Sequence, residues 1–244
     1  MSAPTKIAIL GAEGRMGRAL VGEIAKEPRA ELVAAITSPK SKSIGRPLAG
    51  VPLGADMRAA LDMCDVLIDF SHPQAAIDAA LLMHAAKCRA FVTGTTGYEW
   101  AEERALEKAS QSIALVKSGN FSLGICVLEA LVETATQTLA EDWDIDILDI
   151  HHRFKKDAPS GTALMLGAAA KRGRNGRADI KYASLRHGGV IGEHAVHIGS
   201  TLETLTLSHT AIDRAVFAKG ALTAALWAVN QPKGAYTMRD VLGL

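Results

Sequence analysis

The stretch HHRFKKDAPSGT, at residues 151–162, gathers several groups that can do chemistry. His151 and His152 close an alternating segment, so they are expected to point to opposite sides of a strand end. Lys155 adds a cation, and Ser160 is well placed to cap a helix that follows it. An imidazole that titrates near neutral pH can act as a general acid, while a lysine and a helix start can bind carboxylates. The segment predicts an acid beside an anion-binding pocket.

Two other interpretations of this segment compete with that of a substrate site. A His-His pair is a candidate for metal binding, but no third ligand follows at a familiar spacing, so no metal is predicted. A basic loop that only solvates a strand end is the second alternative. The backbone N–H groups of Gly161 and Thr162 and one hydroxyl lie at this helix start, and their convergence with the imidazole and the lysine favours the substrate site.

A glycine-rich turn near the start of the chain is the second group with a chemical role. Its residues are, in order, Gly11, Ala12, Glu13, Gly14, Arg15, Met16 and Gly17. The turn lies between an apolar run at 6–10 and a helical pattern at 15–26, where glycines permit a close approach of a pyrophosphate to a helix N-terminus. The spacing is GxxGxxG rather than GxGxxG, and a purely structural turn is the alternative. Because further strands and helices follow, a dinucleotide site is favoured.

The end of the second predicted strand bears on which dinucleotide is used. An acidic residue there usually pairs with the ribose hydroxyls of NAD, whereas basic residues accommodate the 2′-phosphate of NADP. Residues 35–42 hold no acid, but they hold Lys40, Lys42 and three hydroxyl side chains, Ser38 among them. This composition favours NADPH, or the use of both cofactors, and a solvated loop is the alternative.

Three more loops follow predicted strands and are candidates for the nicotinamide side of the cleft. They are DFSHP at 69–73, TGTTG at 93–97 and KSGNFS at 117–122. Ligands of open α/β sheets bind at the carboxyl ends of the strands, so position favours these loops more than composition does. The loop at 117–122 also precedes a change of pattern, and it is the natural hinge between two domains.

The elements that must position these loops alternate between strand and helix in the first half of the chain. Strands are predicted at 31–36, 65–70, 89–93 and 113–116, with helices at 73–86 and 99–110. This order is typical of an α/β protein with a doubly wound parallel sheet. After residue 122 the pattern changes to a helix at 123–139, alternating strands at 144–150 and 202–208, and a helix at 217–229. The second half predicts a more open sheet with one buried face.

The composition indicates an ordinary globular protein. The chain has 244 residues, of which 48% are hydrophobic and 22% charged, and its net charge is +1. The small net charge gives no reason to expect a nucleic acid or an anionic membrane as partner. Cys64, Cys88 and Cys126 lie among apolar neighbours, as reduced cytosolic thiols do. With neither a secretory leader nor a membrane-spanning run recognisable, a cytoplasmic protein is expected.

Together the motifs resemble dihydrodipicolinate reductase (4-hydroxy-tetrahydrodipicolinate reductase), a family of lysine and diaminopimelate synthesis. The resemblance rests on GAEGRMG, DFSHP, TGTTG, GNFSLG and, above all, HHRFKKDAPSGTA, and it continues through RHGGVIGEH to the MRDVL tail. It therefore covers essentially the whole chain. The glycine-rich start is weakly specific, whereas the segment from His151 to Ala163 is highly specific.

The resemblance implies a Rossmann-type dinucleotide-binding domain at 1–121 plus 214–244, with a substrate-binding and tetramerisation domain inserted at 122–213. It implies hydride transfer from NADH or NADPH to a small cyclic dicarboxylate with loss of water, by a homotetramer joined through the open sheets. The implied catalytic residues are His151 and Lys155. The implied substrate ligands are His152, Lys155, Gly161 and Thr162. The implied cofactor contacts are Gly11, Ala12, Glu13, Gly14, Arg15, Met16, Ser38, Gly94, Thr95, Thr96, Ser118, Gly119, Asn120 and Phe121.

The chain departs from the family pattern in ways that concern the cofactor more than the substrate. Glu13 stands where a smaller residue is common, and its side chain is expected to face solvent. Thr37 and Ser38 replace the usual acid after the second strand. A reductase of another small imino or amino acid, resembling aspartate dehydrogenase, would share the glycine-rich turn but does not need two histidines. A regulator that binds NADP without turnover would need no proton donor, so His151 and Lys155 argue against it.

Overall fold

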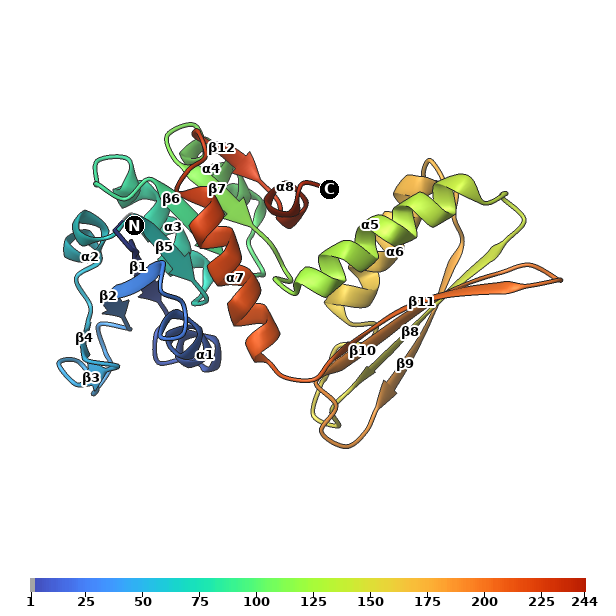
Figure 1. Cartoon of the computed structure of the whole chain (residues 1–244), viewed down its shortest axis with the longest axis horizontal. Coiled ribbons are helices and arrows are strands. Elements are labelled where there is room, and N and C mark those ends of the chain that lie inside the picture. The colour runs from blue at the N-terminus through green and yellow to red at the C-terminus, as the bar shows by residue number, and fades with distance from the viewer. Residues whose placement is uncertain (1–2) are drawn as a thin grey trace. The chain divides into compact units, whose positions relative to one another are not determined.

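The computed structural model describes residues 3–244 and contains two compact units. The first unit comprises the described residues up to Phe121 together with Phe217–Gly243, and the second comprises Ser122–Val216 with Leu244. Figure 1 shows that each unit has its own sheet and its own helices. The second unit is therefore an insertion in the sequence of the first.

The first unit is built on an eight-stranded sheet of order β12-β7-β6-β5-β1-β2-β4-β3. Neighbouring strands pair in parallel except β3 and β4. The strands are β1 (Thr5–Leu10), β2 (Ala30–Ile36), β3 (Pro47–Leu48), β4 (Val51–Gly54), β5 (Val66–Asp69), β6 (Ala90–Thr93), β7 (Ala114–Lys117) and β12 (Gly234–Tyr236). The chain builds outward from β1 through β2 and then returns to β5, so the strand order reverses between β1 and β5. Crevices for ligands form at such a reversal.

Helices cover both faces of this sheet, which explains the uninterrupted apolar runs of its central strands. Leu67, Phe91 and Leu115 pack on one face against α2, α3 and α4. Ile7 and Ile9 alternate with the residues of that face and are also fully buried, and Figure 1 shows α1 and α7 over this second face. The helices are α1 (Arg15–Ile24), α2 (Met57–Met63), α3 (Pro73–Met83), α4 (Trp100–Ala109), α7 (Ala215–Ala228) and α8 (Met238–Leu242).

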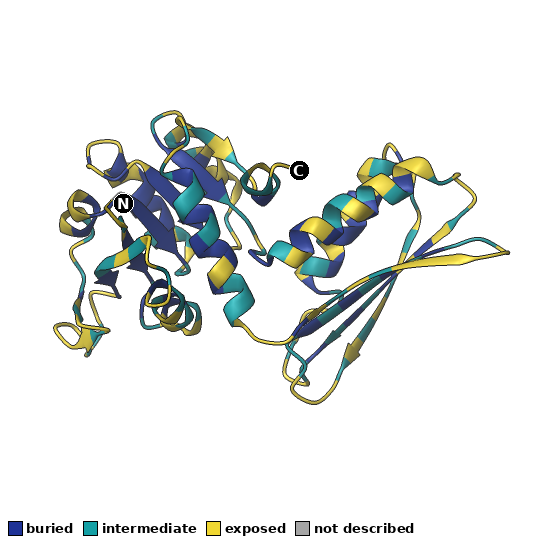
Figure 2. Ribbon diagram, in the orientation of Figure 1, coloured by how far each residue is buried: buried dark blue, intermediate teal, exposed yellow. Residues whose placement is uncertain are grey.

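The second unit has a four-stranded sheet of order β11-β10-β8-β9, and helices pack on one face of it. The strands are β8 (Asp144–His151), β9 (Ile180–Arg186), β10 (Gly192–Gly199) and β11 (Thr204–Ala211), and the helices are α5 (Leu123–Thr138) and α6 (Gly161–Gly173). Ile147 and Val196 pack against Leu166 on the covered face. Buried positions alternate with exposed or half-buried ones along β8, and Figure 2 shows buried and more exposed segments within the strands of this sheet. This is the sheet with one buried face that the sequence predicts.

The α/β class and the parallel sheet are confirmed, and several short elements are additional to the prediction. The strand predicted at 202–208 begins later, at Thr204, because Leu202 lies in a turn and is almost fully exposed. Neither β9 nor β10 is predicted from the sequence, because both carry polar residues on the buried face of the sheet. The remaining additions are the strands β3, β4 and β12 and the helices α2 and α8. The added strands of both sheets lie at a sheet edge or next to an edge strand.

Candidate active site

Loops that follow parallel strands of the first unit meet along one edge of its sheet. They are the turn at 11–17 after β1 and the loops at 70–72, 94–96 and 118–121 after β5, β6 and β7. The N–H groups of Phe70, Gly94 and Ser118 bond to the carbonyl oxygens of Leu10, Asp69 and Thr93 over 3.1, 2.8 and 3.2 Å. The structure thus brings most of the sequence-predicted cofactor residues to one edge. Ser38 lies exposed in the loop after β2.

Glycines in the turn after β1 are required by close backbone contacts. Gly11 has a φ of 81°, and a Cβ there would lie 2.6 Å from the carbonyl oxygen of Phe70. At Gly17, in α1, a Cβ would lie 2.4 Å from the carbonyl oxygen of Gly11. Gly14 caps α1 without a side-chain hydrogen bond. The N-terminus of α1, where anions are favoured, therefore has no cap side chain over it.

A buried carboxyl stands at the end of β5. Asp69 is fully buried and accepts hydrogen bonds from the hydroxyls of Ser71, at 2.5 Å, and Thr93, at 2.7 Å. Burial raises the pKa of Asp69, although these hydrogen bonds oppose the rise. Beside it, the rings of Phe70 and Phe121 meet edge to face at 5.7 Å. These contacts hold the loops after β5, β6 and β7 in place.

The Glu13 side chain does not simply face solvent. Its Oε2 accepts hydrogen bonds from the hydroxyls of Thr37 and Ser41, the latter at 2.6 Å. Hydrogen bonds from Ser41, Thr37 and Ser43 lower the pKa of Glu13 to about 2. Glu13 remains partly exposed, and in addition three hydroxyls after β2 lie within its reach.

His151 ends β8 on the covered face of the second sheet. It is 7% exposed, and its Nδ1 lies 2.9 Å from Oδ1 of Asp149, which is fully buried. An ionised carboxylate can only accept, so we assign the hydrogen to Nδ1, which leaves Nε2 for other chemistry. A Cβ at Gly192 would lie 3.2 Å from that Nε2, so glycine keeps the space beside it open.

The Asp149 carboxylate is held by a full set of donors. The Ser184 hydroxyl donates to Oδ2 at 2.6 Å, and the Ser160 N–H donates to the same oxygen at 3.2 Å. Nη1 of Arg186 donates to Oδ1 at 2.7 Å. Burial alone would raise the pKa of Asp149, but the hydrogen bonds from Ser184 and Arg186 outweigh it and lower the pKa. Asp149 is therefore ionised beside His151 near neutral pH.

A second imidazole packs against His151. The ring of His194, on β10, meets the His151 ring edge to face at 5.0 Å, and its Nε2 lies 3.2 Å from the Ser160 hydroxyl. Burial, and then the charge of His151, lower the pKa of His194 to about 4. Burial also lowers the pKa of His151, against the pull of Asp149. His194 is thus a neutral neighbour at physiological pH.

Lys155 stands in the loop between β8 and α6. Its Nζ lies 2.8 Å from Oδ2 of Asp157, and its side chain is 23% exposed. The hydrogen bond from Lys155 lowers the pKa of Asp157. Nη2 of Arg186 donates to the Asp157 carbonyl at 2.7 Å and anchors this loop to β9. The Lys155 charge also acts on His151, whose pKa it helps to lower.

The start of α6 completes the cluster. Ser160 is its N-cap, as the sequence predicts, and its hydroxyl accepts from the Ala163 N–H at 3.1 Å. Gly161 is exposed, with open space where a Cβ would stand, and Thr162 lies beside it in the same turn. Nδ1 of His152 is buried without a hydrogen-bond partner in the described part of the chain. The structure gathers the predicted catalytic and substrate residues in the second unit.

Three residues of this cluster are not predicted from the sequence: Asp149, Arg186 and His194. Asp149 could have been found, because positions 145, 147, 149 and 151 share one face of a strand and an acid on that face requires partners. Arg186 and His194 lie on β9 and β10, which the sequence analysis does not name as strands. Their residue types alone do not indicate that they lie beside His151 in the folded chain.

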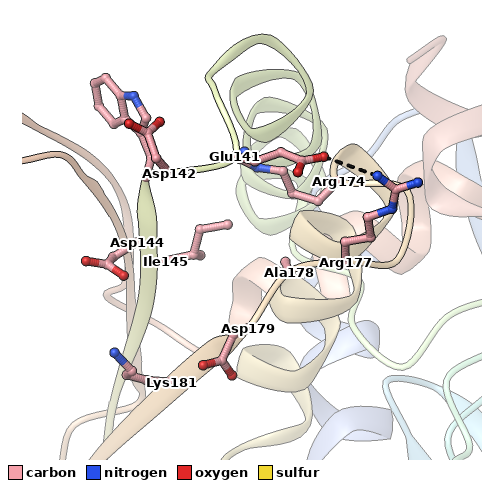
Figure 3. A pocket seen from close by; sticks show the side chains of 10 residues that line it. Glu141, Asp142, Asp144, Ile145, Arg174, Arg177, Ala178, Asp179 and Lys181 are labelled. Carbon is pink, nitrogen blue, oxygen red and sulfur yellow. Dashed lines mark ion pairs between the residues drawn. The ribbon is translucent and has the colours of Figure 1, made fainter.

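A separate pocket opens at the other end of β8. It has a volume of about 320 Å³ and is lined by acidic and basic residues from the ends of α5, α6 and the neighbouring strands. Figure 3 shows Glu141 pointing toward Arg177, with the ion pair between them at 3.6 Å. Its lining contains none of the predicted catalytic residues, so we do not assign the reaction to it.

Residues 3–244 contain neither a membrane-spanning helix nor a metal-binding cluster. None of the helices there is long and apolar enough to cross a membrane. No group of three or more His, Cys, Asp or Glu side chains in that range is arranged to hold a metal ion. The three cysteines are buried thiols.

A parallel sheet with a glycine-rich turn at its strand-order reversal defines a protein of the dinucleotide-binding α/β class, here with an inserted second sheet. The models of the N-terminus and C-terminus of dihydrodipicolinate reductase match residues 5–121 and 124–242. The chain belongs to the dihydrodipicolinate reductase family.

Individual relatives agree with the family. The 4-hydroxy-tetrahydrodipicolinate reductase of Allorhizobium ampelinum is 44% identical over 267 residues, covering 98% of each chain, and that of Caulobacter vibrioides is 42% identical over 262 residues, covering 100% of this chain and 99% of its own. Both alignments are longer than this chain, which therefore lacks residues that the relatives have. A dipicolinate-bound dihydrodipicolinate reductase from Paenisporosarcina sp. TG-14 has a TM-score of 0.83 at 21% identity, covering 96% of this chain and 97% of its own. That likeness concerns the fold.

Proposed function

We propose that this chain is the oxidoreductase that reduces 4-hydroxy-tetrahydrodipicolinate to tetrahydrodipicolinate with a reduced pyridine nucleotide, in diaminopimelate and lysine synthesis. One hydride and one proton enter the substrate, and one water leaves. The observation that carries the proposal is the His151–Asp149 pair beside Lys155 and the start of α6. Family membership supports the choice of substrate.

In this proposal the residues of the second unit bind the dicarboxylate and handle the proton. Asp149 holds Nδ1–H of His151, so Nε2 is the atom that gives and takes the proton. Lys155 is the second proton donor and, with His152 and the first turn of α6 at 161–162, a ligand of the carboxylates. The buried, unpartnered Nδ1 of His152 fits a ligand that the chain itself does not provide.

The residues of the first unit fit a dinucleotide. Gly14 leaves the N-terminus of α1 without a side-chain cap, and the loops after β1, β5, β6 and β7 lie along the sheet edge that contains the strand-order reversal. We propose that the cofactor contacts are those the resemblance implies, from Gly11 to Met16, Gly94 to Thr96 and Ser118 to Phe121. When bound, the nicotinamide supplies the hydride. Lys40 and Lys42 would favour NADPH, and the choice between NADH and NADPH also depends on Glu13.

The test supplies the substrate with dihydrodipicolinate synthase, aspartate semialdehyde and pyruvate, and follows loss of the reduced nicotinamide by its absorbance. We expect oxidation that depends on both the synthase and this chain. If the chain binds the cofactor but gives no oxidation above the synthase-only control, the proposed substrate is wrong.

Replacing Lys155 with Met should raise KM for the substrate by about 10-fold or more and lower kcat, because a charged hydrogen bond to a carboxylate is lost. Steady-state kinetics with the coupled substrate measure both constants. Lys156→Met is the matched control, since Lys156 is exposed and adjacent in sequence. If the two variants have the same kcat and KM, Lys155 is not part of the substrate site.

We further propose that the chain is a cytoplasmic homotetramer joined through the uncovered face of the second sheet. Ile150 pairs with Leu185 across β8 and β9 on that face, and Leu185 is 50% exposed. A second copy would bury this apolar strip and the pairing edges of the sheet. Light scattering should give a mass about four times 25.7 kDa. A monomeric mass at working concentration would contradict this assembly.

A further inference from the structure

Glu13 is the one acidic side chain of the glycine-rich turn, and it reaches the end of β2. The N–H groups of Gly11 and Ala12 both bond to the Ile36 carbonyl at 3.0 Å, which fixes the turn against the last residue of that strand. From there the Glu13 carboxylate accepts hydrogen bonds from Thr37 and Ser41. A carboxylate therefore lies at the carboxyl end of β2, although β2 and the loop after it contain no acid at that end.

The end of β2 is where a dinucleotide fold distinguishes NAD from NADP. A carboxylate there accepts hydrogen bonds from the ribose hydroxyls of NAD, and it repels the 2′-phosphate of NADP. We propose that Glu13 does this in the present chain, in place of an acid on β2, and so selects NADH over NADPH. The proposal rests on the proposed function only in taking the cofactor to be a pyridine nucleotide.

The hydrogen bonds within the turn leave the Glu13 carboxylate able to serve a ribose. A carboxylate has about four acceptor positions, and the Thr37 and Ser41 hydroxyls both donate to Oε2. The pKa of Glu13 near 2 means that the carboxylate is ionised at every pH at which the enzyme would work. Its side chain is partly buried and tethered, so its charge has a fixed place.

Lys40 and Lys42 are the residues that oppose this selection. Both are exposed in the loop after β2, and their charges would attract a 2′-phosphate. Exposed lysine charges are screened by salt and carried on flexible stems, whereas the Glu13 carboxylate is held against the strand end by hydrogen bonds. The fixed negative charge should therefore dominate at physiological ionic strength.

The experiment measures the dissociation constants of NADH and NADPH by fluorescence titration, without substrate, for wild type, Glu13→Gln and Glu27→Gln. Glu27 is the control because it is another carboxylate of the first unit that accepts side-chain hydrogen bonds, in its case from Arg29. We expect wild type to bind NADH about 10-fold or more tightly than NADPH. Glu13→Gln should narrow that ratio about 10-fold, mainly by tightening NADPH, and Glu27→Gln should leave it unchanged.

Two results would overturn the inference. One is wild type that binds NADPH as tightly as NADH, a measurement that needs no variant to fold. The other is that Glu13→Gln weakens the binding of both cofactors equally. That result is expected if Glu13 only holds the turn against the loop after β2. If the chain binds NADH preferentially but does not reduce the substrate, the proposed substrate is wrong and this inference stands. If the chain reduces the substrate but binds both cofactors equally, the proposed function stands and this inference is wrong.

Discussion

His151→Gln is expected to lower kcat by about 10²-fold or more while the dissociation constant of the cofactor stays near the wild-type value. Glutamine keeps a polar side chain of similar reach but cannot give and take a proton near neutral pH. The cofactor should be unaffected because its proposed contacts all lie in the first unit, whereas His151 ends β8 in the second.

The comparison needs two controls. His84→Gln makes the same chemical change at an exposed position of the first unit and should leave kcat unchanged. Thermal unfolding of His151→Gln should stay close to wild type, which separates loss of the proton donor from loss of the fold. An unchanged kcat would show that His151 is not the proton donor of the reaction.

The large features of the fold follow from hydrophobic periodicity. Buried runs such as that of β6 (AFVT), bounded by turn residues and alternating with helical patterns, leave few alternatives to a parallel sheet covered on both faces. Short edge elements such as β3, with two residues, bury too little to leave a periodic signal. They depend on tertiary pairing that local sequence does not encode.

The candidate site was predictable where its residues are contiguous. From His151 to Thr162 the chemistry lies on one strand end, one loop and one helix start, so spacing alone indicated a common pocket. Asp149 is different, because burial alternates regularly along β8 but the acids do not: those at 144 and 146 are exposed, and Leu148 shifts the next acid to the buried face. Regular alternation obscured that change.

The contacts of Glu13 show a second reason why the sequence alone does not predict every contact of the site. The sequence places an acid in the glycine-rich turn and hydroxyls more than 20 residues later, and nothing local connects them. They meet because β1 and β2 are neighbours in the sheet, and the turn after β1 bonds to the Ile36 carbonyl. This tertiary contact sets the direction of the Glu13 side chain, so the local sequence does not indicate its hydroxyl partners.

Asp149→Asn is expected to lower kcat by about 10²-fold or more and to shift the pH profile, although Asp149 is a positioning residue. The hydrogen bond and charge of Asp149 raise the pKa of His151 against burial, which lowers it. If protonated His151 is the donor, kcat/KM falls as pH rises through the His151 pKa. Loss of the carboxylate lowers that pKa further, so the fall should occur at lower pH in the variant.

The measurement is kcat/KM against pH for wild type, Asp149→Asn and Asp146→Asn. Asp146 lies on the same strand with its side chain exposed, so its replacement should leave the profile in place. Because Asp149 and His151 act as a unit, the double variant with His151→Gln should be little slower than His151→Gln alone.

A merely structural role for Asp149 predicts a different result. Its carboxylate also binds Ser184 and Arg186, so Asp149→Asn should destabilise the second unit, and a thermal melt will register that loss. Destabilisation alone would reduce the active fraction at every pH and leave the midpoint of the profile where it is. A midpoint that moves down, measured well below the melting temperature, therefore assigns Asp149 to holding the His151 proton at Nδ1.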